Sequence, residues 1–350
     1  MLVESVVLIL FAGVLAYGIF GGADFGGGFW DLCAGGDRRG AEARHRIDRS
    51  IGPVWEANHV WLIFILVYLW TAFPGAFAAL ATALYAPLFG AAAGIVFRGA
   101  AFVFRKSSST LAGARFFGAL FASSSVITPF FLGAAVGAVA SGRVPRDGAA
   151  PAWSAWLSPT SLLGGVMAVG TCAWLAAVFL AADADRDGEE RLARSFARRA
   201  QVAGATLGAV SLVGIAVLWF DAPTLASRLR TWAAPAVALS AAGGLSALRE
   251  LRRGRPRAAR PPAVIAVAAI LGGWALGQYP WILVDELTLS EAAAEPAVLR
   301  ALVAVFGLAA LLVVPSLVLL FVLTERGSLS ARERDDSSKS RLRAAGGPDA

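Results

Sequence analysis

Four side chains that could move or balance charge lie in otherwise apolar stretches of this sequence. Asp24 lies in "YGIFGGADFGGGFWDL", Glu56 and His59 lie in "SIGPVWEANHVW", and Arg98 lies in "AAAGIVFRGAAFVFR". Carboxylates bind and release protons, and a histidine three residues beyond Glu56 shares its helical face and titrates near neutral pH. An arginine can compensate the two acids. The combination predicts proton transfer in an apolar environment.

The same side chains also have a structural interpretation. Arg98 could extend to a headgroup layer. Asp24 and Glu56 could lie at helix ends, and His59 could be a hydrogen-bonded packing residue. However, an ionisable group in hydrocarbon costs roughly 2.5–3.5 kcal/mol on insertion scales, so such groups usually have a function. Four of them at one depth on three consecutive segments favour the functional interpretation.

The segments that carry these residues are predicted to be membrane-spanning helices. Of the 350 residues, 57% are hydrophobic and 16% are charged, and the mean hydropathy is +0.66. A helix needs about 20 apolar residues to cross a bilayer, and the continuous apolar runs do not alternate as the strands of a membrane barrel do. The sequence therefore predicts an all-α integral membrane protein. The nine predicted spans are residues 2–22, 52–73, 76–104, 116–141, 160–182, 199–219, 232–249, 262–284 and 297–323.

Composition also predicts how the chain is organised. Residues 1–325 are expected to form one polytopic membrane domain. The tail, residues 326–350, is polar and poor in aromatic residues and is predicted to be a disordered cytoplasmic segment. Cys33 and Cys172 lie in different regions and form no CxxC pair, so no disulfide framework is expected.

Positive charges fall in alternate connections between the predicted spans. The connections on one side, together with the tail, hold 25 Lys and Arg residues, whereas those on the other side hold five. Because positively charged loops stay in the cytoplasm, we expect the N-terminus outside and the C-terminus inside. This distribution explains the net charge of +7 without a nucleic-acid partner. It also places Asp24, Glu56 and Arg98 toward the cytoplasmic side.

Four motifs follow one another in the order of a known family. They are "GGADFGGG" at the end of the first span, "SIGPVWEANHVW" in the second, "FRGAAFVFR" in the third, and "QYPWILVDELTLSEAA" late in the chain. Through these motifs the chain resembles subunit II of the cytochrome bd quinol oxidases over nearly its whole length, apart from the tail. The resemblance implies two four-helix bundles plus a peripheral helix in a bacterial cytoplasmic membrane.

The resemblance also implies a division of labour between two subunits. A haem-bearing subunit I, with haem b, haem d and quinol, reduces oxygen to water in the respiratory chain. The subunit that this chain resembles ligates no haem, stabilises subunit I in a heterodimer among membrane lipids, and contributes a cytoplasmic proton route. Haem iron takes ligands such as His, Met or Cys, and two histidines and two methionines are too few for three haems. A bound quinone is compatible with the resemblance.

Particular residues receive roles from this resemblance. Asp24, Glu56 and Arg98 match the family's helix 1 aspartate, its Trp-Asp acid and its helix 3 arginine. Together with His59 they form the predicted proton route, and no residue of this chain is expected to be catalytic. Other matching residues are expected to fix helix packing, where small side chains permit close approach. These packing residues are Gly22, Gly26, Gly28, Trp55, Asn58 and Trp61.

Three departures from the family pattern indicate a divergent branch. His59 stands where relatives usually have Glu or Gln, and Val103 replaces a Glu. Phe116 and Phe117 stand where many relatives have Trp-Asp. His59 as a ligand of haem or quinone is a weaker alternative to its role in proton transfer.

Two other functions fit parts of the sequence. A proton-coupled secondary transporter would also have a polar site within the membrane, although transporters tend to have inverted repeats and a site at the midplane. No convincing internal repeat is visible in this sequence. A purely structural assembly subunit would keep the glycines and tryptophans but would not need Asp24 or Glu56.

Overall fold

The structure, a computed structural model, describes residues 1–35, 37–51, 55–151 and 153–325. The tail lies outside these residues, so its disorder stays a prediction. The described chain divides into two compact units. One comprises Met1–Ile9 and the segment from Glu295 onward, and the other is Leu10–Ala294. The candidate site belongs entirely to the second unit.

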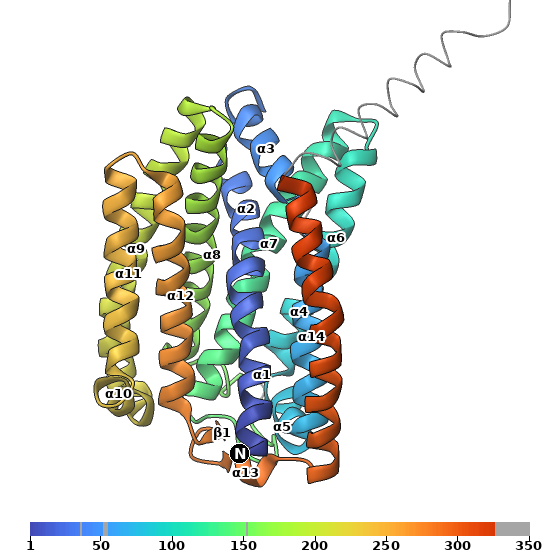
Figure 1. Ribbon diagram of the computed structural model, residues 1–350, viewed down its shortest axis with the longest axis vertical. Coiled ribbons are helices and arrows are strands. Elements are labelled where there is room, and N and C mark those ends of the chain that lie inside the picture. The colour runs from blue at the N-terminus through green and yellow to red at the C-terminus, as the bar shows by residue number, and fades with distance from the viewer. Residues whose placement is uncertain (36, 52–54, 152, 326–350) are drawn as a thin grey trace, which may run out of the picture. The chain divides into compact units, whose positions relative to one another are not determined.

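Apart from one short β-hairpin, the regular elements of the described residues are helices (Figure 1). In chain order the elements are α1 (Leu2–Ala16), η1 (Tyr17–Gly21), α2 (Gly22–Leu32), α3 (Asp37–Ile51), α4 (Trp55–Ala72), α5 (Pro74–Ala83), α6 (Tyr85–Ser107), α7 (Leu111–Ala140), α8 (Pro159–Arg186), α9 (Glu190–Asp221), α10 (Pro223–Arg230), α11 (Ala234–Arg252), α12 (Pro256–Gln278), β1 (Trp281–Leu283), β2 (Leu287–Thr288), α13 (Leu289–Ala292) and α14 (Pro296–Glu325). Within the described ranges seven helical segments are long and apolar enough to cross a membrane, or up to nine if each of two bent helix pairs forms one span. The all-α, polytopic membrane prediction is confirmed.

The first span is longer than the sequence predicted. α1, η1 and α2 form one helical segment that runs to Leu32, whereas the predicted end was residue 22. The glycines that suggested an ending are instead buried within α2. A glycine inside a helix costs roughly 0.5–1 kcal/mol relative to alanine, and tertiary packing overrides that preference here. Asp24 therefore lies inside the segment and not after it.

Prolines explain two other boundaries that differ from the prediction. The predicted helix 76–104 is divided at Leu84. Pro87 lies in the first turn of α6, and in a continuous helix its ring would clash with the carbonyl four residues earlier. The predicted span 262–284 ends at Gln278, because the second residue beyond it is a proline, which favours an extended residue before it. The predicted loop before the second span is also helical, as α3.

α2 occupies a central place in the second unit. It packs against α7 and α8, while α8 packs against α9 and α12 and α6 packs against α7 (Figure 1). The face that α8 buries consists largely of alanine, and its small side chains let the neighbouring helices approach closely. These alanines are Ala173, Ala176, Ala177, Ala181 and Ala184, each no more than 3% exposed.

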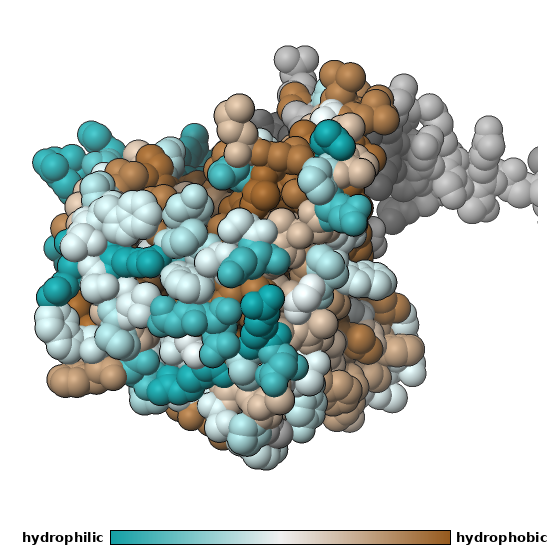
Figure 2. All heavy atoms as spheres, turned by 90° about the horizontal axis from the view of Figure 1, so that it is seen from below, coloured by the Kyte–Doolittle hydropathy of each residue, from teal (hydrophilic) through white to brown (hydrophobic). Residues whose placement is uncertain are grey.

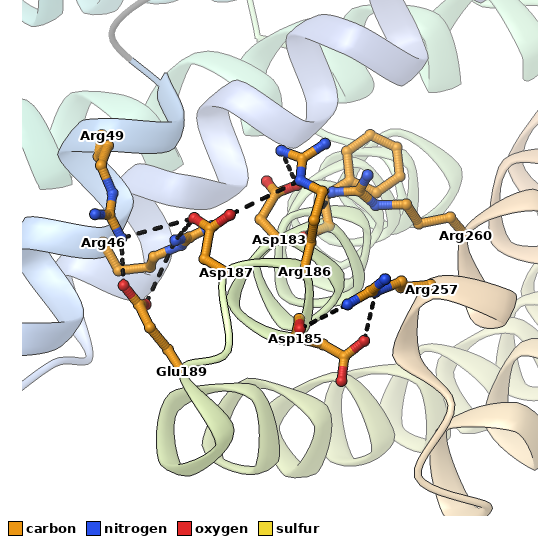
Figure 3. A network of polar contacts seen from close by, with 10 residues as sticks. Arg46, Arg49, Asp183, Asp185, Arg186, Asp187, Glu189, Arg257 and Arg260 are labelled. Carbon is orange, nitrogen blue, oxygen red and sulfur yellow. Dashed lines mark hydrogen bonds and ion pairs between the residues drawn. The ribbon is translucent and has the colours of Figure 1, made fainter. Parts of the chain in front are cut away.

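A network of charges joins α3, the last turn of α8, the α8–α9 connection and α12 at one end of this unit (Figure 3). Arg46, which is only 3% exposed, donates to Asp187 at 2.5 Å and to Glu189 at 3.4 Å. Arg257 contacts Asp185 at 2.6 Å. These pairs hold the connection between two long helices against the helices on either side of it.

The electrostatic environment of Asp187 favours its ionised form. Burial raises the pKa of the Asp187 carboxyl, but the hydrogen bond and charge of Arg46 and the charges of Arg186 and Arg49 outweigh that effect. The net result is a pKa below the ordinary value. The network is therefore expected to weaken only in acid.

The opposite end of the unit carries α10 and the hairpin (Figure 1). β1 pairs antiparallel with β2, with Trp281 opposite Thr288. Arg143, which follows α7, forms a 2.6 Å ion pair with Asp221, the last residue of α9. The Thr160 amide donates to the same carboxylate at 2.9 Å. Figure 2 views the molecule from this end and shows hydrophilic residues gathered on it.

Candidate functional site

The buried centre of the candidate site is an ion pair between Asp24 on α2 and Arg98 on α6. Arg98 donates from Nη2 to Oδ1 of Asp24 at 2.6 Å and from Nη1 to Oδ2 at 3.1 Å. Both side chains are 1% exposed. The pair is therefore a forked, two-bond contact in which each charge compensates the other. The alternative that Arg98 extends to a headgroup layer is wrong for this structure.

The rest of the Arg98 guanidinium is enclosed by α2 and α7. Its Nε donates to Oγ of Ser125 at 2.9 Å, and that hydroxyl donates to the Phe121 carbonyl at 2.7 Å. The guanidinium carbon lies 4.8 Å from the ring centroids of both Phe25 and Phe121. A cation over an aromatic face gains about 2 kcal/mol when desolvated. Arg98 is thus held by a carboxylate, a hydroxyl and two rings.

Two glycines let α2 come close enough to its neighbours to build this site. A Cβ on Gly28 would overlap Oγ of Ser125 on α7, and a Cβ on Gly26 would overlap the Cys172 carbonyl oxygen on α8. Gly22 differs, because its Cβ would meet neighbouring atoms at ordinary distances of 3.5 Å or more. Only glycine therefore fits at two of the three glycine positions that the sequence linked to packing.

A π-helical turn, η1, directly precedes α2. Such turns are rare and occur frequently at functional sites. Tyr17 begins this turn, and its ring meets Phe25 edge to face at 6.4 Å. The Tyr17 hydroxyl is buried and has no hydrogen-bond partner among the residues that the structure describes. Sequence reasoning missed Tyr17, although its spacing of seven residues from Asp24 was a usable signal.

A second ion pair repeats the first, seven residues further along both helices. Arg105 donates to Asp31 at 2.7 Å, and Arg44 on α3 contacts the other oxygen of Asp31 at 2.9 Å. Arg105 also donates to Asp48 at 3.3 Å. The equal spacing of the two acids and of the two arginines fits helices that run parallel. Sequence reasoning missed Asp31, and this shared seven-residue step could have found it.

The second predicted part of the site opens α4. Trp55 and Glu56 belong to this helix, but their side chains lie outside the part of the chain that the structure describes. Asn58 is 4% exposed, and its Nδ2 has no hydrogen-bond partner among the described residues. His59 and Trp61 are partly buried. Asn58 is thus buried, and the packing role of the "WEANHVW" motif stays a prediction.

The register of α4 against α1 places the start of α4 beside η1. α4 packs against η1, and a Cβ on Gly13 of α1 would meet the Phe64 ring at 2.6 Å. Because the two helices run in opposite directions, residues after Gly13 lie level with residues before Phe64. The structure thus joins Asp24 to Arg98 and places His59 on a helix next to the turn that leads to Asp24.

Two of the three departures from the family pattern lie on α6 and α7, while the third, His59, lies on α4. Val103 is 54% exposed and Phe116 is 63% exposed. The Phe117 ring stacks on Phe104 with centroids 5.3 Å apart. Apolar side chains at these positions therefore enlarge an apolar surface and leave the Asp24–Arg98 contact unchanged.

Comparison with known protein families identifies one family. The profile of the family described as "Cytochrome bd terminal oxidase subunit II" matches residues 2–324. A protein of Bacillus subtilis (strain 168) with the name "Putative cytochrome bd menaquinol oxidase subunit II" is 33% identical over 79 residues. That alignment covers 23% of this chain and 22% of the relative, so it spans about a fifth of the relative's length.

A solved structure shares the fold. It is a chain from "The structure of bd oxidase from Geobacillus thermodenitrificans", with a TM-score of 0.78 and 24% sequence identity. The superposition covers 92% of this chain and 98% of the other. At this identity the likeness supports the fold, and the family profile supports the relationship. The chain therefore belongs to the cytochrome bd terminal oxidase subunit II family.

Proposed function

We propose that this chain is the non-haem-ligating subunit of a bd-type quinol:oxygen oxidoreductase and that it contributes a cytoplasmic proton-uptake route for the reduction of oxygen to water. Family membership supports its place in a bd oxidase. The observation that carries the finer proposal is the buried Asp24–Arg98 pair. Because buried ion pairs are weak sources of net stability, a functional reason for keeping one is favoured.

In this proposal the protons enter at the start of α4. Glu56 and His59 take them up, and Tyr17, whose hydroxyl is buried, belongs to the turn η1 against which α4 packs. Asp24 accepts the proton, and Arg98 compensates its charge when the carboxyl is ionised. Arg98 does not carry the proton itself, because a guanidinium stays protonated in proteins. Arg98 is thus a positioning residue for Asp24.

The haem groups belong, in this proposal, to a partner subunit I that holds haem b and haem d and oxidises quinol. Two residues of the types that ligate haem iron are engaged within the packing of this chain. Cys172 is buried where α2 and α8 touch, and the Met167 sulfur accepts a hydrogen bond from Ser211 at 3.6 Å. Among the described residues no group of three or more His, Cys, Asp or Glu side chains could hold a metal ion. We assign this chain to stabilising the partner and guiding protons.

The proposed orientation gives the proton route its direction. With the N-terminus outside and the C-terminus in the cytoplasm, the arginine-rich α3 and the ends of α2 and α6 face the cytoplasm. Protons used to form water then come from the cytoplasm, while quinol releases its protons outside. Charge is separated across the membrane without a pump.

The test uses the complex purified from membranes through a tag on this chain. Bands of b- and d-type haem in a visible difference spectrum support the oxidase partner, and a folded chain that purifies alone without haem contradicts it. Glu56→Gln is expected to lower oxygen consumption per haem by roughly tenfold or more at unchanged haem content. Glu190→Gln, which changes an exposed acid at the start of α9, is the matched control and should retain full turnover.

A purely structural assembly role is the second candidate, and the close contacts at Gly26 and Gly28 favour it. It predicts that a Glu56→Gln complex with normal haem content consumes oxygen at the normal rate. The same two readouts therefore separate the candidates, since only the proton route lowers turnover without lowering assembly.

A further inference from the structure

A cavity of about 420 Å³ lies where the ends of α2 and α6 and the middle of α3 meet the first turns of α7. We term it the basic cavity. Its volume is within the roughly 300–1,000 Å³ usual for small-molecule sites. The residues of its wall that carry the argument are Asp31, Arg44, Arg105, Leu111, Arg115 and Gly118.

The polar part of the wall is positively charged. It contains three arginines and one carboxylate. Asp31 fixes two of the arginines at the wall, since it accepts from Arg105 at 2.7 Å and from Arg44 at 2.9 Å. A guanidinium carries five N–H donors in a planar fork that suits phosphate oxygens. Asp31, Asp48 and the Gly35 carbonyl engage four of the ten N–H donors of Arg44 and Arg105, so donors of these two groups are left for an anion.

The other part of the wall is apolar and small. Ala114, Gly118 and Ala122 are spaced four residues apart, so they form one stripe along α7. Leu111 begins this helix and is 65% exposed. At Gly118 a Cβ would lie 3.9 Å from Cδ of Arg105, in ordinary contact. The stripe therefore begins beside the arginines and runs along α7.

The depth of the basic cavity matches a membrane boundary. Leu32 and Arg105 are the last residues of two candidate spans, and Leu111 is the first residue of a third. Basic pockets between membrane helices at this depth bind anionic lipid headgroups. A soluble anion would use the arginines alone, whereas a lipid would use both parts of the wall.

We propose that the basic cavity binds an anionic phospholipid, with the phosphodiester on Arg44, Arg105 and Arg115 and an acyl chain along the α7 stripe. This site is separate from the Asp24–Arg98 pair and does not depend on the proposed proton route. The bound lipid links α3, α6 and α7 at the membrane boundary.

The test is native mass spectrometry of the delipidated complex, purified in detergent and titrated with dioleoylphosphatidylglycerol. Dioleoylphosphatidylcholine serves as the zwitterionic comparison, and inorganic phosphate serves as the soluble competitor. Wild type is expected to retain phosphatidylglycerol more tightly than phosphatidylcholine by roughly fivefold or more. Excess inorganic phosphate should not displace it.

Two variants locate the binding site. Arg115→Gln should weaken phosphatidylglycerol binding roughly fivefold and leave phosphatidylcholine unchanged. Gly118→Leu fills the stripe and should remove one bound lipid of either kind. Arg252→Gln, an exposed arginine at the end of α11, is the matched control and should bind as wild type. Haem content and melting temperature report whether each variant is folded.

Three results would overturn the proposal. The first is wild-type lipid binding by both Arg115→Gln and Gly118→Leu in folded complexes. The second is equal affinity for the two lipids, which would remove the role of charge. The third is full displacement by inorganic phosphate, which would assign the arginines to a soluble anion. If one variant fails to fold, the other variant and the phosphate competition still decide the question.

Discussion

Replacing Asp24 by Asn would leave a positive charge buried without its counter-charge. The carboxylate accepts two hydrogen bonds from Arg98, at 2.6 and 3.1 Å, and the Arg98 side chain is 1% exposed. Asn keeps one acceptor oxygen but not the charge. Ser125 and the two aromatic rings remain as partners of the guanidinium, yet none of them carries negative charge.

The expected loss is about 3 kcal/mol, at the lower end of the roughly 3–5 kcal/mol found when one partner of a buried ion pair is removed. We take the lower end because the Asn oxygen and the rings recover part of the lost interaction. A loss of this size is about a hundredfold in an equilibrium constant. We therefore expect a clear fall in melting temperature and in the yield of haem-containing complex.

The assay compares Asp24→Asn with a double variant that removes both charges of the buried pair, and with a variant of the second ion pair, Asp31–Arg105. Asp24→Leu/Arg98→Met removes both charges, so most of the assembly should return, because replacing a buried pair by apolar residues is often neutral or stabilising. Asp31→Asn changes a carboxylate whose arginine partner Arg105 is 20% exposed, and it should cost about 1 kcal/mol. Yield is measured by difference spectrum and turnover by oxygen consumption per haem.

Two outcomes would refute the reasoning. If Asp24→Asn assembles and melts like wild type, the pair does not compensate buried charge. If Asp24→Leu/Arg98→Met assembles and also consumes oxygen at the wild-type rate per haem, Asp24 is not part of a proton route. Recovery of assembly without recovery of turnover is the result that the proposed function requires.

The remaining predictions concern packing and pH. Gly26→Val should destabilise by about 3 kcal/mol, because its Cβ would overlap backbone on α8, whereas Gly99→Ala, with nothing within 4 Å, should keep the wild-type melting temperature. Asp187→Asn should lower the melting temperature at pH 7. Because the pKa of Asp187 is depressed in the folded protein, the difference in melting temperature between wild type and variant should persist above roughly pH 4 and vanish as the pH falls below it. Arg143→Gln should cost about 1–2 kcal/mol, because Asp221 loses a 2.6 Å ion pair, and a melting curve with no change would contradict it.

The sequence predicted the part of the site that follows from the free-energy cost of a charged side chain in hydrocarbon. An acid and an arginine in apolar runs had to compensate each other, and Asp24 and Arg98 do so. The spans were also predictable, because hydrocarbon thickness fixes their length. Tyr17 was missed because a tyrosine in an apolar run is unremarkable until its hydroxyl is seen to be buried without a described partner.

The helix boundaries near the site were less predictable, because glycine lowers helix propensity but also permits close helix packing. Gly26 and Gly28 lower helix propensity, and the sequence alone indicated an ending near Asp24. The surfaces of α7 and α8 decide otherwise, since a helix without side chains at these two positions can approach them closely. The local sequence around Gly26 and Gly28 does not show which helix packs against them, so it does not show that close packing stabilises a helix there.

The two ion pairs also constrain how α2 and α6 are aligned. Sliding one helix by a turn, about 5.4 Å, would separate Asp24 from Arg98 and Asp31 from Arg105 together. The buried inner pair would lose all of its charge compensation, while Asp31 would keep Arg44 and Arg105 would keep Asp48. Gly28 adds to this constraint, because the helix fits against α7 only where no Cβ is present. Specifying register is a reason to keep a buried pair that adds little net stability. The same residues can therefore serve assembly and proton transfer, and only measurements that report assembly and turnover separately can assign them.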